Sequence, residues 1–154
     1  MNTKRLRELA TRIETRKVDD PFFSMAHYAT FAGSSAPIEL EKVGPVTCLD
    51  IAGWACYAWK DAVDCTLYRG EAARFDEPFY WAHGRDLLGL TDREADSLFL
   101  GQWTSTPMEQ ITREQAVQRL RGLAFLQEDR AARTKRMQSK NSETTQQEPT
   151  SQVA

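Results

Sequence analysis

The segment from Thr47 to Val63, TCLDIAGWACYAWKDAV, constrains the fold most because it is the only stretch that is apolar on nearly every side. A helix that is apolar all round is normally buried all round. Small residues there let neighbouring backbones approach closely, and Trp54 supplies a large packing surface. We therefore predict a central helix over 47–63, with Thr47 as its N-cap and Asp50 in the position of a capping box.

Helical periodicity predicts two helices before this segment. In 3–17, apolar residues recur at i, i+3, i+4 and i+7, which places them on one helix face. Pro21, preceded by two aspartates, is a suitable first residue for a short helix over 21–31. Between this helix and the central one we expect a loop with one short extended piece at 38–40.

Three further helices are predicted after a connecting stretch at 64–77. The first covers 78–88 and ends at Gly89, which tolerates the left-handed conformation of a helix C-terminus. The second and third begin at capping boxes, which pair Thr91 with Glu94 and Thr112 with Gln115.

Together these elements predict an all-α protein, a compact bundle of five or six helices. At 154 residues the chain has the length of one domain. We assign that domain to 1–129. Residues 130–154 are predicted to form a basic, frayed helix end and then a disordered tail, because from Ser139 onward few apolar side chains offset the entropy of ordering.

Charge divides the chain at the same point. Residues 130–154 have a net charge of +3, which leaves −5 on 1–129. An acidic body does not attract a polyanion over a broad surface, so nucleic-acid binding would use the basic segment. We keep a nucleic-acid-binding regulator as a second alternative, and its candidate residues are Arg130, Arg133, Lys135 and Arg136.

The cysteines define the enzymatic alternative. Three cysteines without a C-x-x-C pair argue against a disulfide framework and against a zinc site, and we predict no metal and no cofactor. A small hydrolase or transferase would use Cys48 as nucleophile, His83 as base and Asp50 beside them. The sequence leaves open whether His27 and His83 share a pocket.

Aromatic residues provide the candidates for partner binding. Phe79, Tyr80 and Trp81 are consecutive and thus about 100° apart on a helix, so they cannot all face one core. Trp103 stands in a polar turn. Exposed aromatic rings near arginine are typical of protein interfaces, so we select Tyr80, Trp81, Trp103 and Arg85. The alternative, aromatic rings that fold back over the core, has equal support.

No apolar run reaches the roughly 20 residues of a membrane span, and the N-terminal stretch lacks the apolar core of a secretion signal. We therefore expect a cytoplasmic protein without a membrane partner. The sequence leaves its oligomeric state open.

Two further motifs stand in the sequence. The pattern L-L-G-L-T-x-x-E-A-x-x-L-F occurs without a gap at Leu87–Phe99. A second pattern, C-G-T-x-x-C-x-A-G-W-A, corresponds to Pro45–Ala55, but Pro45 and Asp50 occupy the two cysteine positions. Together the motifs resemble a family of small proteins encoded by phages and by bacterial genomes, many of them actinobacterial. The resemblance implies a fold and a mobile-element setting. It implies no reaction, and the missing cysteines remove any thiol or metal role that they have in relatives.

Our leading functional hypothesis is a non-enzymatic phage or mobile-element accessory protein that acts by protein–protein binding. Small size, an acidic body and the absence of familiar catalytic motifs favour it. Inhibition of a host defence complex is one concrete form, and the host cytoplasm would then be its location.

Overall fold

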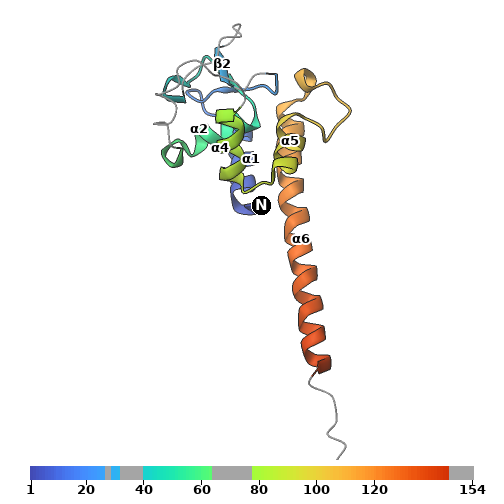
Figure 1. Ribbon diagram of the computed structural model, residues 1–154. Helices are drawn as coiled ribbons and strands as arrows, with labels where there is room; N and C mark the ends of the chain where they lie inside the picture. Colours follow the sequence, from blue (N-terminus) through green and yellow to red (C-terminus); the bar gives the residue numbers. More distant parts are fainter. Residues whose placement is uncertain (27–28, 32–39, 64–77, 146–154) are drawn as a thin grey trace, which may run out of the picture.

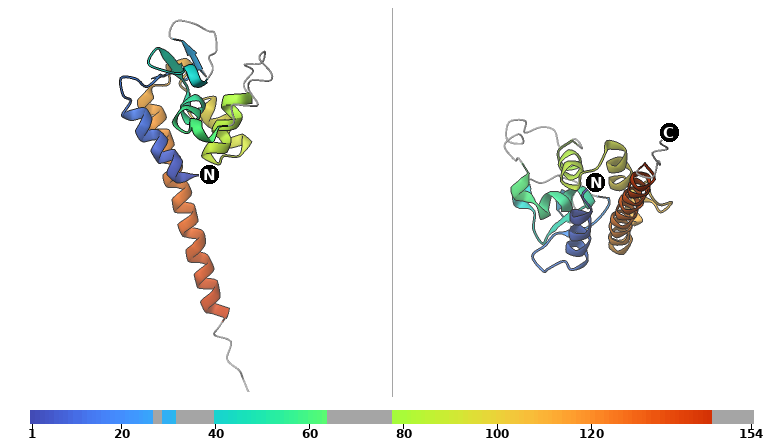
Figure 2. Two further views of the ribbon diagram at one scale, coloured as in Figure 1. Left: turned by 90° about the vertical axis from the view of Figure 1, so that its left-hand side faces the viewer. Right: turned by 90° about the horizontal axis from the view of Figure 1, so that it is seen from below.

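The computed structural model describes residues 1–26, 29–31, 40–63 and 78–145 (Figure 1). These residues form a body of short helices with a small sheet, and one long helix, α6, that runs past the body and projects beyond it. The views in Figure 2 show the same projection from two further directions.

The chain is mostly helical, as predicted, but it is not purely all-α. The described helices are α1 (Thr3–Glu14), α2 (Ile51–Ala58), α4 (Pro78–Leu88), α5 (Asp92–Phe99) and α6 (Arg113–Thr145). Short 3₁₀ helices lie at Leu40–Lys42, Lys60–Ala62 and Met108–Gln110. The strands are β1 (Phe22–Phe23), β2 (Ala29–Phe31) and β3 (Thr47–Leu49).

The sheet replaces the helix predicted over 21–31, and that prediction is wrong. Strand β3 is central, with β1 parallel on one side and β2 antiparallel on the other. The Ser24 amide extends the β1 pairing by donating to the Leu49 carbonyl at 2.9 Å. These pairings join residues more than 15 positions apart, and such tertiary pairing overrides the local pattern that suggested a helix.

The central segment 47–63 is not one helix. Thr47 belongs to β3, and its hydroxyl donates to the Gly44 carbonyl at 2.7 Å, so Thr47 closes a turn rather than capping a helix. Asp50 is the N-cap of α2, because its Oδ1 accepts the Gly53 amide at 2.7 Å. The prediction of Thr47 as N-cap is therefore wrong, and the helix begins three residues later.

Helix α2 still lies at the centre of the core, as its composition indicated. All residues from Ile51 to Cys56 are buried. Helix α4 packs against α2 closely: a Cβ built at Gly84 would lie 3.1 Å from the Ala52 α-carbon. Gly84 therefore sets the approach of the two helices, since any side chain there would push α4 outward.

Helices α1 and α6 form the second part of the core, and they run antiparallel. Their buried apolar residues face each other: Leu6, Leu9 and Ile13 from α1, and Ala116, Val117, Leu120 and Ala124 from α6. Two exposed ion pairs flank the contact, Arg121 with Glu14 and Arg7 with Glu128, each at 2.6 Å. Exposed pairs of this kind contribute about 1 kcal/mol or less, so apolar packing holds these helices together.

The predicted starts of α4, α5 and α6 are confirmed, and so is the predicted end of α4. Helix α4 begins at Pro78, Gly89 has a φ of 61°, and Thr91 with Glu94 forms the capping box of α5. Thr112 and Gln115 exchange the equivalent two bonds at the start of α6. The connecting stretch predicted at 64–77 lies outside the described residues. Of the extended piece predicted at 38–40, only Leu40 is described, and it begins a 3₁₀ helix.

Helix α6 is longer than predicted. It continues through Thr145, so the disorder predicted from Ser139 is wrong as far as that residue, and 146–154 lie outside the described residues. Residues 131–140 are all exposed. A helix already formed against α1 needs no new nucleus, and each added residue then contributes one hydrogen bond, so a polar continuation can stay helical.

Candidate functional site

Cys48 lies in an environment that disfavours a nucleophilic thiolate. It is on the central strand β3, half-buried, while its neighbours Thr47 and Leu49 are fully buried on the opposite side of the strand. Burial raises the pKa of the Cys48 thiol above its usual value. A reactive cysteine needs the opposite shift, because the thiolate is the nucleophile.

Asp50 caps helix α2 from a buried position, where a charged carboxylate is energetically unfavourable. The side chain is buried, and Oδ2 has no hydrogen-bond partner among the described residues. Burial raises the pKa of Asp50 to about 8, although the bond from the Gly53 amide acts in the other direction. At neutral pH the group is therefore mostly a neutral acid, and its bonded oxygen, Oδ1, is used in capping α2.

His83, the base of the enzymatic alternative, lies on a different element from Cys48 on β3 and from Asp50 at the start of α2. His83 is half-buried on α4, one residue before the contact of Gly84 with α2. His27 and Cys65 lie outside the described residues. The structure therefore does not test whether His27 and His83 share a pocket. Within the ranges that the structure describes, no group of three potential ligands could hold a metal ion.

The predicted aromatic candidates fold back onto the body. Tyr80 is 7% exposed and belongs to the core. Trp81 packs edge-on against Phe99, with ring centroids 6.4 Å apart, and Trp103 donates its Nε1 hydrogen to the Leu98 carbonyl at 3.2 Å. The prediction that these rings are exposed for partner binding is therefore wrong for Tyr80, which is buried. Trp81 and Trp103 are half-buried and pack over the core.

Arg85 completes this arrangement. Its guanidinium lies 5.2 Å from the centre of the Trp81 ring and forms ion pairs with Asp86 at 2.8 Å and Asp92 at 2.6 Å. Arg85 thus links α4 to the start of α5. It does not offer an unpaired cation to a partner.

Sequence reasoning missed a pair of exposed apolar side chains on α6, Phe125 and Leu126, which we call the apolar pair. Phe125 is 64% exposed and Leu126 is 48% exposed. Consecutive helical residues lie about 100° apart, so the two flank the line opposite the buried stripe of Val117, Leu120 and Ala124. That geometry could have been found from the sequence, because both residues fall outside the stripe.

Gly122 lies on the same outer line, one turn before the apolar pair. No atom comes within 4 Å of a Cβ built at Gly122, so the backbone there faces open space. Two large apolar side chains beside a bare stretch of backbone form a shallow surface that another chain can approach closely.

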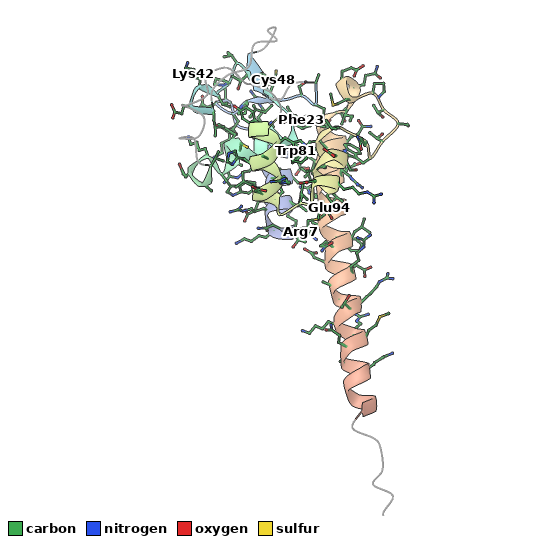
Figure 3. All side chains as sticks on the ribbon, viewed as in Figure 1. Arg7, Phe23, Lys42, Cys48, Trp81 and Glu94 are labelled. Carbon is green, nitrogen blue, oxygen red and sulfur yellow. The ribbon has the colours of Figure 1, made fainter. Side chains whose placement is uncertain are left out.

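Beyond the apolar pair, the projecting part of α6 is strongly basic, and we call residues 130–145 the basic arm. Its sequence contains five cationic residues and one acidic residue. The cationic side chains are all exposed: Arg130, Arg133, Lys135, Arg136 and Lys140. In Figure 3, side chains along this part of α6 stand off the helix, and no other described helix or strand lies beside them.

No family model, no curated protein and no solved structure matches the chain. The resemblance to the phage and actinobacterial family therefore stays a prediction. None of the described helices is long and apolar enough to cross a membrane.

Proposed function

We propose that this chain is a non-enzymatic binding protein that recognises a protein partner through the outer face of α6. The exposed apolar pair carries this proposal. Aromatic side chains are enriched at protein interfaces, and a few such side chains usually provide most of the binding free energy.

The size of the exposed surface is sufficient for an anchor. Full burial of a Phe or Leu side chain contributes about 1.5–3 kcal/mol, and these two are roughly half exposed. Covering both would contribute about 2–3 kcal/mol. That is a meaningful share of a micromolar affinity, which corresponds to about 8 kcal/mol.

The location of the apolar pair also suits binding without rearrangement. The buried apolar residues of α6 that pack on α1 lie away from the apolar pair, so a partner on the outer face displaces nothing from the core. Binding would then leave the body unchanged. The original candidates Trp81 and Trp103 are half-buried and remain secondary contacts in this proposal.

The enzymatic alternative has less support. Cys48 has a raised pKa, and the Asp50 carboxyl caps α2 from a buried position. From the family resemblance alone, we propose that the protein acts in the cytoplasm of a phage host. The protein partner that it binds would then be a host defence complex, which it inhibits.

A photo-crosslinking amino acid at position 125 tests the proposal in lysate from a bacterial host. We expect one stoichiometric protein adduct from position 125 and none from position 93, an exposed site on α5. Replacement of both members of the apolar pair by serine should abolish recovery of the same partner.

The matched control replaces two other exposed apolar residues, Val18 and Val46, by serine. This variant should recover the partner at the original level. Absence of a stoichiometric adduct, or equal loss in the control variant, would count decisively against binding through the outer face of α6.

A further inference from the structure

We propose that the basic arm binds the phosphate backbone of a nucleic acid, independently of the protein partner. The arm presents cations along one line, and Met137 is the one large exposed apolar side chain among its described residues. Nucleic-acid interfaces are polar and strongly basic, whereas protein interfaces need an apolar centre and are depleted in lysine.

The cations follow one line on α6. Arg133, Arg136 and Lys140 are separated by three and four residues, so they lie on one side of the helix. This side continues the outer line of Gly122, away from the stripe that packs on α1. Arg130 lies within about 90° of that side, so four of the five cations can face one strand of phosphates.

Two acidic residues, Glu128 and Asp129, lie just before the arm, and they neutralise little of its cationic charge. Arg133 forms an ion pair with Asp129 at 2.9 Å, but its side chain remains 72% exposed. Glu128, which precedes Asp129, is held by Arg7 at 2.6 Å. An exposed pair such as Arg133 with Asp129 contributes about 1 kcal/mol or less and can rearrange when a phosphate approaches.

Distance separates the arm from the acidic body. At a rise of 1.5 Å per residue, Arg136 and Lys140 lie about 12 Å and 18 Å along the helix beyond Glu128, the last α6 residue paired with α1. Interactions between exposed charges are largely screened beyond about 8 Å at physiological ionic strength. The net charge of −5 on residues 1–129 therefore does little to repel a polyanion at the end of the arm.

Fluorescence anisotropy of the full chain with labelled 20-base-pair DNA and RNA duplexes of the same sequence tests the proposal. Contacts to about four phosphates give a slope near −4 for the logarithm of the association constant against the logarithm of salt concentration. Both duplexes should bind, because both present the phosphate backbone that the cations would contact. Binding of only one duplex would assign the phosphate source to that nucleic acid.

Two triple variants separate the arm from general electrostatics. Arg133, Arg136 and Lys140 are changed to glutamine in the first, and the exposed body residues Lys4, Lys60 and Arg93 in the second. Each loses three positive charges, and glutamine keeps helix propensity. The arm variant should bind at least about tenfold more weakly at 50 mM salt, with the slope reduced by about 3, and the body variant should change far less.

Three results would overturn the proposal: a salt slope near zero, equal losses in the two variants, or tighter binding to polyglutamate than to either duplex at equal charge. Polyglutamate preference would assign the arm to an acidic protein surface instead. Replacement of the apolar pair by serine should leave the affinity for the duplexes unchanged, so failure of this proposal and failure of the protein-binding proposal are distinguishable.

Discussion

Replacement of Asp50 by asparagine should stabilise this protein at neutral pH. The folded chain buries the Asp50 carboxyl completely and leaves Oδ2 without a hydrogen-bond partner among the described residues. Its pKa is raised to about 8 by burial, from an ordinary value of 3.8. The charged form is therefore strongly disfavoured in the folded state and accessible in the unfolded state.

The sign of the pH dependence follows from proton binding. Between pH 3.8 and 8 the unfolded chain loses the Asp50 proton while the folded chain keeps it, so the free energy of unfolding falls as pH rises. Stability from this group is fully present below pH 3.8 and is lost by pH 8. A shift of about four units corresponds to about 6 kcal/mol in total, and about 4 kcal/mol of that is already lost at pH 7.

Asparagine keeps the features that α2 needs and removes the titration. Its Oδ1 can accept the Gly53 amide as the aspartate does at 2.7 Å, and asparagine is an equally good N-cap. Urea unfolding, followed by tryptophan fluorescence from pH 4 to pH 8, measures the effect. We expect the Asp50→Asn variant to match wild type near pH 4 and to exceed it by up to about 4 kcal/mol at pH 7.

Two control variants fix the interpretation. Asp50→Ala removes the cap as well as the titration, so it should be less stable than Asp50→Asn by about 1 kcal/mol at every pH. Thr91→Ala removes an exposed cap and should lower stability by a similar amount, with the wild-type pH profile retained. Wild-type stability that stays flat or rises from pH 4 to pH 8, with Asp50→Asn weaker throughout, would refute the reasoning.

Two further predictions concern the thiol and the core. In a Cys65→Ser background, Cys48 should react with a disulfide probe at pH 7.5 more slowly than free cysteine does, because burial raises the pKa of the Cys48 thiol. A rate equal to that of free cysteine would support the enzymatic alternative instead. Gly84→Ala should lower the free energy of unfolding by about 1–3 kcal/mol, because the new Cβ meets backbone of α2 at 3.1 Å. Gly122→Ala, in open space within α6, should raise it by up to about 1 kcal/mol, and urea unfolding of both variants checks the contrast.

Local chemistry in the sequence predicted much of the helical structure. Helix α1 follows its i, i+3, i+4 spacing, and α5 begins at its capping box and ends before a glycine with positive φ. Each of these features depends on residues within about one turn of each other. A pattern of that range is visible in a single sequence.

Features that depend on distant residues were not predictable in the same way. Strand β3 forms because β1 and β2 supply its hydrogen-bond partners. The local sequence of Thr47–Leu49 does not predict these pairings. Because Thr47 belongs to strand β3, Asp50 is the residue that caps helix α2. The burial of Tyr80 likewise depends on how α4 packs against α2, since helical spacing alone could not decide which ring of 79–81 faces the core.

Helix α6 has two parts: the sequence identified the basic residues from Arg130 onward as candidates and missed the apolar pair. Up to Glu128 one side of the helix is fixed by packing on α1, and the other side carries the apolar pair. Beyond Glu128 the helix projects past the body, and residues 131–140 are exposed throughout. Substitutions at exposed positions usually change stability by less than about 0.5 kcal/mol. The outer face and the arm can therefore be altered with little effect on folding, so losses of binding there report directly on recognition.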